Sequence, residues 1–460
     1  MNDDAGVQPP LQQRVQSAHA VEQYEVCFAR QPILNRDGML CGFELKARIV
    51  RIESPDAPRD APGAVSDESD GAPGDGANPH AGEIRAFVGA LASPGLRAAL
   101  AGHDAQIDVP AWLLFDDGMR HLPPGRFTFE LSPALGADPA LIERLVKLHG
   151  YRYRFVLDDV AQIDDAFAKL LPYVEAVKID FSRIPRVMLP KLAEVLKAAG
   201  KILIADHVAN AADFSLAHEF GFDRFQGYFF ALPQGSTRHA SAPRHALLDM
   251  LQLLASEPTV AQLEAGLMLN PVLVMHLMRL ANSGRFDLGR KVTTLREAIN
   301  ATGTDRIARW TQLLLYADGR KVPLEDDPLL QLAATRARFI ELAMERLPDA
   351  GLGEVEAAFL VGVFSLIDTV FGGAIGGTLD RLALSPMIRK AIVQREGRLG
   401  QLLDAVQALE CANWARIDEV CERLESLGAA DVSALGLEAA EWAGMADRNT
   451  DASELERIED

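Results

Sequence analysis

Short apolar segments alternate with helical stretches in the first half of the chain, and most of these segments end at a charged or amide side chain. The seven segments are YEVCFARQPIL…MLCGFEL, AQID, RFTFE, RFVLDD, AVKID, KILIAD and RFQG. Strands that alternate with helices predict a parallel sheet covered by helices. About eight such units over roughly 200 residues favour closure of the sheet into a (β/α) barrel.

The polar side chains that close the predicted strands are the first candidates for chemistry, because active sites of such barrels lie where the strand carboxyl ends meet. These side chains are Glu44, Asp108, Glu130, Asp158, Asp159, Lys178, Asp180, Asp206 and Gln226. We expect them to converge on one mouth of the barrel. Several carboxylates beside one lysine suit Mg²⁺, Mn²⁺ or Ca²⁺ at a phosphate ester.

Each of these positions also has an ordinary structural explanation. A single acid at a strand end is more often a cap or a solvated loop residue, so the prediction depends on several acids in register. Asp158 and Asp159 give the most specific signal, because adjacent carboxylates point in different directions and one can bridge two metals; the alternative is a helix N-cap. Lys178 can stabilise a leaving oxygen, or it can simply pair with Asp180.

The second half of the chain reads as helical after the segment LPQGSTRHASAPRH, residues 232–245. Apolar residues from Leu247 to Leu254 keep helical spacing. Thr259 and Gln262 form a predicted capping box, and Ser385 followed by Pro386 predicts another helix start. The predicted divisions are a loose N-terminus over 1–23, a barrel over 24–233, a helical domain over 245–430 and a helical, acidic tail over 431–460.

The stretch over 52–83 interrupts the barrel pattern after the second strand. Between Ile52 and Ile84 its only large aliphatic residue is Val65, and Pro, Gly and acidic residues dominate. Such a segment cannot bury enough apolar surface to offset the entropy lost on ordering. We expect a disordered insertion that packs against nothing.

Composition limits the class of partner. The chain has 460 residues and a net charge of −19, which favours two domains and argues against nonspecific binding of a nucleic-acid duplex. A small anionic ligand stays compatible, since a bound divalent cation reverses the local sign. Four cysteines without CxxC spacing predict idle thiols in a reducing, cytoplasmic setting.

Neither the N-terminal segment nor the most apolar window of the chain predicts a membrane segment. The opening MNDDAGVQPP has no basic region and no apolar region, so a secretory signal is not expected. The most apolar window, 357–379, contains Asp368 and ends in glycines. A buried helix followed by a turn explains this window better than a membrane span.

The motifs of the first half resemble those of EAL domains, the cyclic-di-GMP phosphodiesterase fold. The segment ARQPILNRDGMLCGFELKAR resembles the family's opening, most closely in the YuxH-like branch, where an HDOD domain follows. The family's QPI falls on 31–33, its E-A-L-x-R on 44–48, its LDD on 157–159, its KID on 178–180 and its QGY on 226–228. The resemblance covers 24–233 and implies a TIM-like (β/α) barrel.

The resemblance also implies roles for individual residues. It implies metal ligands for Mg²⁺ or Mn²⁺ at Glu44, Asp108, Glu130, Asp158 and Asp159. It implies catalytic groups at Lys178 and Asp206, and contacts to cyclic-di-GMP from Gln31, Arg48 and Gln226. Asp108 stands where the family has asparagine.

Two departures from the family pattern bear on activity. The family's glycine-bearing loop after Asp-Asp is replaced by residues 160–166, which contain no glycine. The family's A-E-G-V-E falls on 205–209, where Asp206 is one methylene shorter than glutamate and Ala209 has no carboxylate. Small misplacements can lower a rate by about 10²-fold, so we expect little hydrolysis.

The second half resembles the HDOD domain, a helical relative of HD phosphohydrolases that lacks their metal ligands. The similarity runs from LLDMLQLLASEPTVAQLEAGLMLNPVLVMHLMRLANS through CANWA. No histidine follows His276, so the later residues cannot supply the His/Asp cluster of an HD metal site. The resemblance implies contacts with signalling proteins or with the barrel.

Three functions stay open from the sequence. The preferred one is a bacterial signal-transduction regulator that acts by binding a ligand or a protein through a degenerate EAL domain. The alternative is an active Mg²⁺- or Mn²⁺-dependent cyclic-di-GMP phosphodiesterase. The third is a scaffold that has lost all ligand contact.

Overall fold

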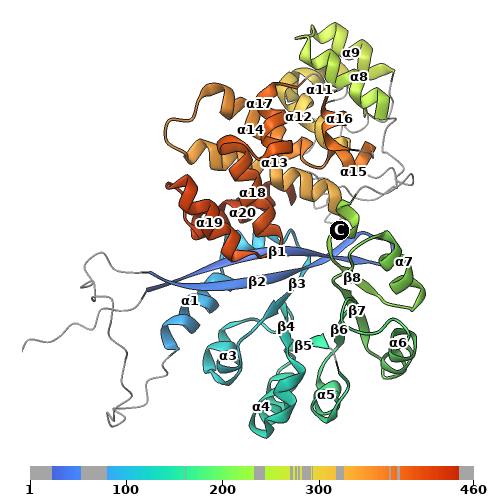
Figure 1. The fold of residues 1–460 in the computed structure, drawn as a ribbon, viewed down its shortest axis with the longest axis vertical. Helices are drawn as coiled ribbons and strands as arrows, with labels where there is room; N and C mark the ends of the chain where they lie inside the picture. The colour runs from blue at the N-terminus through green and yellow to red at the C-terminus, as the bar shows by residue number, and fades with distance from the viewer. Residues whose placement is uncertain are drawn as a thin grey trace, which may run out of the picture.

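The computed structural model consists of a closed barrel of eight strands and a group of helices stacked on one side of it (Figure 1). It describes residues 23–52, 80–160, 162–232, 244–269, scattered positions between 273 and 292, and then 294–316, 326–371, 374–380 and 384–444. The predicted N-terminal and C-terminal ends, apart from 23 and 431–444, therefore lie outside the described residues.

The barrel strands follow one another in sequence order around the closed sheet. They are β1 Gln23–Asn35, β2 Leu40–Ile52, β3 Asp104–Asp108, β4 Phe127–Leu131, β5 Arg154–Val160, β6 Ala176–Asp180, β7 Ile202–Asp206 and β8 Arg224–Gln226. Every residue of β4 and β6 is buried, as expected for parallel strands covered on both faces. The predicted barrel is thus confirmed.

The predicted parallel sheet is found from β2 to β8, but the prediction is wrong for β1, which pairs antiparallel with both β2 and β8. The reason is the short turn between β1 and β2. The Asn35 side chain accepts hydrogen bonds from the backbone N–H groups of Asp37 and Met39, and Gly38 adopts a φ of 72°. A tight turn of this kind produces a hairpin, whereas parallel strands need a longer crossover.

Short helices cover the outside of the barrel (Figure 1). They are α1 Ala81–Leu91, α2 Pro94–Ala99, α3 Ala111–Phe115, α4 Pro139–Gly150, α5 Asp165–Leu170, α6 Leu189–Ala198 and α7 Ala211–Glu219. The predicted insertion over 52–83 lies largely outside the described residues. Its last residues belong to α1, whose Ile84 is buried in the core, so the predicted boundary at 83 falls too late.

In the described part of 244–444 the regular elements are helices, as predicted. They are α8 Arg244–Ala255, α9 Val260–Met268, α11 Leu295–Thr302, α12 Thr304–Leu314, α13 Pro328–Arg346, α14 Leu352–Phe364, α15 Ile367–Phe371, α16 Ile375–Leu379, α17 Pro386–Gln394, α18 Gly397–Glu410, α19 Trp414–Leu424 and α20 Ala429–Gly444. The capping box at Thr259 and the N-cap at Ser385 are both confirmed.

The apolar window 357–379 spans α14, α15 and α16, three separate helices of which α14 is the longest. Among the described residues, no helix combines the length and apolar character needed to cross a bilayer.

Helix α20 joins the helical part to the barrel. The predicted start of a terminal tail at 431 is wrong, because α20 begins at Ala429 and continues to Gly444. The Ser433 hydroxyl accepts a hydrogen bond from the backbone N–H of Phe28 in β1 at 2.7 Å and donates one to its carbonyl at 3.1 Å. The helices therefore rest on the hairpin β1–β2, directly above the barrel mouth.

Candidate functional site

The alternation of side chains along the strands places polar groups at the barrel mouth. Val156, Ala176 and Ile204 form a small apolar cluster of their own, separate from the main core. Two residues further along the same strands come Asp158, Lys178 and Asp206. Because alternate residues of a strand share a face, these polar side chains lie one layer above the apolar cluster, on the same face.

Three carboxylates meet in this layer. Oxygens of Glu44, Glu130 and Asp158 lie within 4.8 Å of one another, and both glutamates are buried. The Lys178 ammonium lies among them, with Nζ 2.5 Å from Glu130 Oε1, 3.1 Å from Glu44 Oε1 and 3.7 Å from Asp158 Oδ1. The predicted convergence is therefore found for these four residues, and the alternative pairing of Lys178 with Asp180 is wrong.

A second lysine, which the sequence reasoning missed, enters the same cluster. Lys46 pairs with Glu44 and places Nζ 3.7 Å from Glu130 Oε2 and 3.9 Å from Asp158 Oδ2. It stands two residues after Glu44 in β2, so the alternation of the strand places both side chains on one face. That alternation was the available signal.

Burial and the neighbouring charges shift the pKa values of the lysines and glutamates in this cluster. Burial alone lowers the pKa of Lys178, but Glu44 and Glu130 outweigh burial and raise it above its ordinary value. Burial raises the pKa of Glu44, and Lys178 with Lys46 reverses this and lowers it. Burial keeps the pKa of Glu130 well above its ordinary range. Burial also lowers the pKa of Lys46, but Glu44 and Glu130 outweigh burial and raise it above its ordinary value. Both lysines are therefore charged, and Glu44 is anionic.

The two carboxylates at the end of β5 diverge, as their adjacency predicted. Asp159 has a φ of 51°, and its exposed carboxylate pairs with Arg183. Asp158 instead belongs to the group that also contains Glu44 and Glu130. Asp108 ends β3 opposite Glu130 in the parallel register, and burial raises its pKa. Of the five predicted metal ligands, the three-carboxylate group contains Glu44, Glu130 and Asp158.

The end of β7 adds a cation to the rim. His207 adopts a φ of 54°, and its Nδ1 lies 3.0 Å from Asp206 Oδ2 and 3.7 Å from Asp180 Oδ2. The hydrogen bond to Asp206 is the main cause that raises the pKa of His207 to about 9. Asp206, a predicted catalytic group, is thus paired with an imidazolium at neutral pH.

Two predicted ligand-binding residues form a polar chain across the hairpin. Gln226 Nε2 donates to Glu44 and, at 3.1 Å, to Gln31 Oε1. Gln31 Nε2 in turn donates to the backbone carbonyl of Glu410 at 3.2 Å, so the chain ends in the helical part. The last residue of the QGY motif, Tyr228, donates a hydrogen bond from its hydroxyl to the Glu410 carboxylate.

The third predicted ligand-binding residue has a different partner. Arg48 Nη1 lies 2.9 Å from both carboxylate oxygens of Asp418 in α19. The strand β2 has 13 residues, so Arg48 lies beyond the mouth and reaches the helical part instead. The structure does not bring Arg48 together with the three-carboxylate group.

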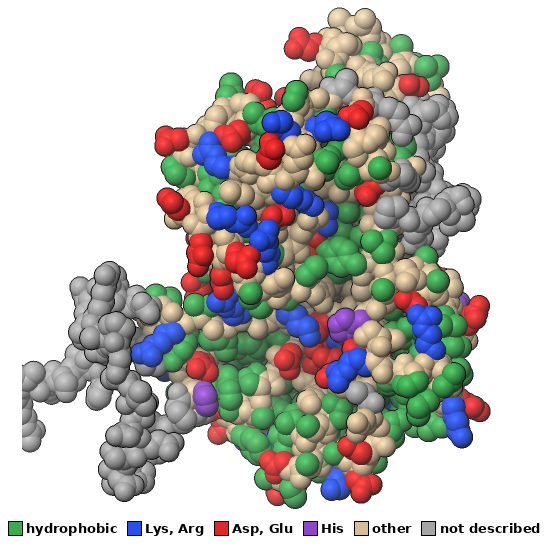
Figure 2. Space-filling model, viewed as in Figure 1, with side chains coloured by type: hydrophobic (Ala, Val, Ile, Leu, Met, Phe, Trp, Pro, Cys, Tyr) green, Lys and Arg blue, Asp and Glu red, His purple; other side chains and the backbone are tan. Residues whose placement is uncertain are grey.

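A cavity of about 650 Å³ opens at the mouth, between barrel and helices. Its lining residues from the barrel include Gln31, Glu44, Lys46, Asp206, His207, Ala209, Gln226 and Tyr228, and those from the helical part are Glu410, Cys411, Ala412 and Trp414. Figure 2 shows acidic, basic and histidine side chains gathered at this boundary. The volume lies in the range of about 300–1,000 Å³ that is usual for small-molecule sites.

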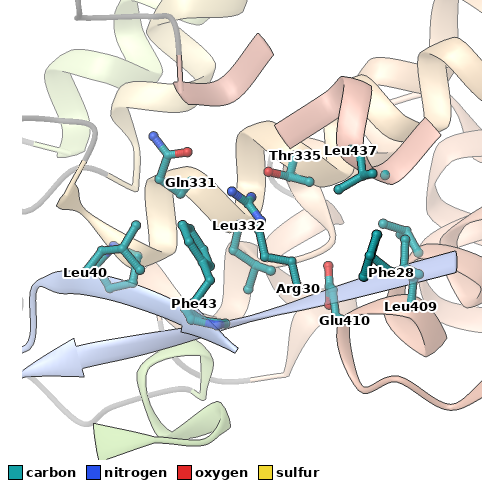
Figure 3. Close-up of a pocket in the computed structure, with 14 residues that line it drawn as sticks. Phe28, Arg30, Leu40, Phe43, Gln331, Leu332, Thr335, Leu409, Glu410 and Leu437 are labelled. Carbon is teal, nitrogen blue, oxygen red and sulfur yellow. The ribbon is translucent and has the colours of Figure 1, made fainter. Parts of the chain in front are cut away.

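A second, smaller cavity of about 60 Å³ lies further along the hairpin. Figure 3 shows Arg30, Phe28, Leu40 and Phe43 of the hairpin facing Gln331, Leu332, Thr335, Leu409, Glu410 and Leu437 of the helices. The Arg30 guanidinium carbon lies 4.0 Å from the centroid of the Phe43 ring. Glu410 lines both cavities and so stands between the mouth and the packed interface.

Comparison with protein families agrees with this architecture. Residues 108–233 match the family model described as EAL domain, and residues 242–362 match the one described as HDOD domain. The chain carries an EAL domain followed by an HDOD domain. The EAL match begins at the end of β3, so the hairpin with Gln31, Glu44 and Lys46 precedes the matched region.

Two curated proteins align with this chain over most of their length, and a solved EAL domain is similar to the barrel part. YuxH of Bacillus subtilis, named as uncharacterized, is 25% identical over 424 residues, or 91% of this chain and 98% of that protein. CdgJ of Vibrio cholerae, named a cyclic di-GMP phosphodiesterase, is 27% identical over 428 residues, or 91% and 92%. The EAL domain of FimX from Pseudomonas aeruginosa, solved with c-di-GMP, covers 45% of this chain and 89% of its own at 16% identity, with a TM-score of 0.33.

The donor set fits a divalent cation only in part. Three carboxylates within 4.8 Å offer the hard oxygen ligands that Mg²⁺ or Mn²⁺ prefers. The same space, however, receives the ammonium groups of Lys46 and Lys178. The chemistry of the mouth therefore depends on which cation the carboxylates hold.

Proposed function

We propose that this EAL–HDOD protein is a signal-transduction regulator that binds a cyclic dinucleotide, cyclic-di-GMP, at the barrel mouth and does not turn it over. The observation that carries the proposal is that the cavity of about 650 Å³ at the barrel mouth is lined by both domains. A ligand in that cavity contacts the barrel and the helical domain together, and its presence therefore alters how the two domains pack.

The cavity offers suitable groups for each part of such a ligand. Lys46 and the protonated His207 are cations for the phosphates. Tyr228 and Trp414 are aromatic rings on which bases can stack. Gln31 adds amide hydrogen-bonding groups. The helical domain would supply a separate surface for protein partners.

The side chains at the mouth support the proposed absence of turnover. Hydrolysis of a phosphate ester at such a site uses a metal-held water, and Mg²⁺ or Mn²⁺ would be held by Glu44, Glu130 and Asp158. Lys46 already contacts these three carboxylates. Ala209 lines the cavity with a methyl group, where the family resemblance places a carboxylate.

The second candidate function is the active phosphodiesterase. It is favoured by the converged carboxylates with Lys178 and by the name of the relative CdgJ. In that case Lys178 would stabilise the developing charge on the scissile phosphate or its leaving oxygen.

Glu410 links the barrel mouth to the helical domain by hydrogen bonds on both sides. Glu410 accepts hydrogen bonds from Gln31 and Tyr228 of the barrel, and both of its carboxylate oxygens accept from Arg336 of α13. Ligand contacts at Tyr228 therefore act on a buried ion pair of the helical domain.

Calorimetry with cyclic-di-GMP, with and without Mn²⁺, tests binding by the full chain. We expect binding without metal, and weakening by at least about fivefold in Trp414→Ala, since one stacked base contributes about 1–3 kcal/mol. Tyr151→Ala, which removes an exposed aromatic residue of the barrel surface, is the control. If cyclic-di-GMP binds neither with nor without Mn²⁺, the result would favour a scaffold that has lost ligand contact.

Turnover is measured in parallel with a large excess of protein over cyclic-di-GMP, by chromatography of the linear product. The regulator predicts little or no product with Mg²⁺ or Mn²⁺. Repeated turnovers within minutes, abolished by Glu44→Ala or Lys178→Ala, would establish the phosphodiesterase instead.

A further inference from the structure

Lys46 lies where the carboxylates of the barrel mouth would hold a metal ion. Its Nζ contacts Glu44 and lies 3.7 Å from Glu130 Oε2 and 3.9 Å from Asp158 Oδ2. These are the same three residues whose oxygens form the candidate cation group. One ammonium group thus reaches every member of that group.

We propose that Lys46 is a tethered cation that takes the place of a divalent metal ion in the EAL barrel, so that the mouth is charged for ligand binding without metal. The role of this charge in nucleotide binding rests on the proposed function. The competition between Lys46 and a metal ion does not rest on it, because that competition is measured without nucleotide.

The two lysines of the cluster differ in how they are held. The Lys178 side chain is 1% exposed and lies between Glu44 and Glu130, so it is a fixed part of the barrel interior. The Lys46 side chain is 33% exposed and approaches the carboxylates from the cavity. Lys46 is therefore the cation that an entering metal ion would have to displace.

A buried oxygen supports the same assignment. Within the described residues, Glu130 Oε2 is buried and has no hydrogen-bond donor. Lys46 Nζ, at 3.7 Å, stabilises it by charge alone. A buried carboxylate oxygen without a donor is unfavourable, so it is a ready ligand for a cation closer than this ammonium.

Charge balance gives the direction of the effect. Three carboxylates face the ammonium groups of Lys178 and Lys46. Replacement of Lys46 by a neutral side chain removes one positive charge and leaves Lys178 as the remaining ammonium of this pair, so the mouth becomes more negative and attracts a divalent ion more strongly. A divalent ion that enters beside an intact Lys46 is repelled by it.

Titration of Mn²⁺ into the full chain without nucleotide tests the proposal. The variant is Lys46→Leu, and two controls are Lys46→Arg, which keeps the charge, and Lys147→Leu, which removes an exposed lysine of α4. Calorimetry should show Mn²⁺ binding at least about tenfold tighter in Lys46→Leu than in the wild type. Both controls should match the wild type.

A second substitution locates the gained ion. Glu130→Gln combined with Lys46→Leu should remove the gain, because it takes away the buried carboxylate beside the vacated position. If Lys46→Leu proves unstable by thermal denaturation, Lys46→Gln keeps a polar chain of similar length and should show the same gain.

Two results would overturn the proposal: wild-type protein that binds Mn²⁺ as tightly as Lys46→Leu, or folded Lys46→Leu and Lys46→Gln that gain nothing. The nucleotide arm is separate. Lys46→Leu should bind cyclic-di-GMP more weakly without metal and recover when Mn²⁺ is added. If the Mn²⁺ gain is found while no form of the protein binds the nucleotide, the proposed function fails and Lys46 keeps its role as competitor.

Discussion

The Arg336 guanidinium donates two hydrogen bonds, each 2.7 Å long, to the two carboxylate oxygens of Glu410. Both residues are buried, and Arg336 also donates to the Ser365 hydroxyl at 3.1 Å. The ion pair belongs to the helical domain, yet Glu410 also accepts from Gln31 and Tyr228 of the barrel. The Glu410 carboxylate therefore has one partner in the barrel, Tyr228, and one in the helical domain, Arg336.

Loss of one member of this pair should be severely destabilising. In Glu410→Gln the Arg336 charge stays buried without its counter-ion, which costs about 3–5 kcal/mol in comparable pairs. Urea denaturation should therefore show a large fall in the free energy of unfolding.

The matched control is Glu438→Gln, whose partner Arg346 lies 3.4 Å away at the surface with both side chains nearly half exposed. Exposed pairs contribute about 0–1 kcal/mol, so this variant should stay close to the wild type. Equal effects of the two substitutions would contradict the role assigned to the buried pair.

Gly227 should tolerate no side chain. Its φ of 138° and ψ of 174° are open almost only to glycine, and a Cβ built there would overlap the backbone carbonyl of Val208. Gly227→Ala should lower the free energy of unfolding by well over ~2 kcal/mol and displace the neighbouring Gln226.

Gly125→Ala separates strain from overlap. Gly125 has a φ of 86° but open space around the position of a Cβ, so its substitution should cost only about 1–2 kcal/mol of backbone strain. If Gly227→Ala were no worse than Gly125→Ala, the close approach of Val208 would not limit this position.

Much of the barrel could be predicted because each strand carries its own signal. The period of two that places Val156 inside also places Asp158 at the mouth, and the same holds for Ala176 with Lys178. Strand order followed from the chain order of the units. The convergence of carboxylates was therefore a local consequence of the pattern.

The parts that could not be predicted depend on contacts between distant residues. Alternation places Glu44, Lys46 and Arg48 on one face of β2, but only the length of that strand beyond the mouth decides that Arg48 meets Asp418. Nothing in the local pattern around Glu410 indicates that it faces Gln31, since α18 is an ordinary helix in sequence.

Arg48 should contribute little to ligand binding. Its guanidinium is engaged by Asp418, and both side chains are partly exposed. Arg48→Ala should change the affinity for cyclic-di-GMP by less than about twofold and the free energy of unfolding by less than ~1 kcal/mol. A double-mutant cycle with Asp418→Ala, repeated at higher salt, should show a small coupling that decreases as salt screens it. A tenfold loss of affinity in Arg48→Ala would return this residue to the nucleotide site.

His207 should carry a positive charge throughout the neutral range. Its hydrogen bond to Asp206, helped by the charges of Asp180 and Asp158, raises its pKa to about 9. An unfolded histidine titrates near 6.5. Because the folded value is the higher one, the stabilisation by these carboxylates is fully present below about pH 6.5 and is lost as pH rises towards 9.

NMR titration of the His207 ring, assigned by its disappearance in His207→Gln, should give a midpoint near 9. Asp206→Asn should bring that midpoint down most, because it removes the strongest partner, and Asp180→Asn should lower it less, since Asp180 lies 3.7 Å away. Asp117→Asn, at an exposed carboxylate of the outer barrel surface, should leave it unchanged. If a cyclic dinucleotide uses this imidazolium to bind its phosphates, its affinity should fall over the same pH range in the wild type and lose that dependence in His207→Gln. A midpoint near 6.5 in the wild type would show that Asp206 is free of His207 and available for another cation.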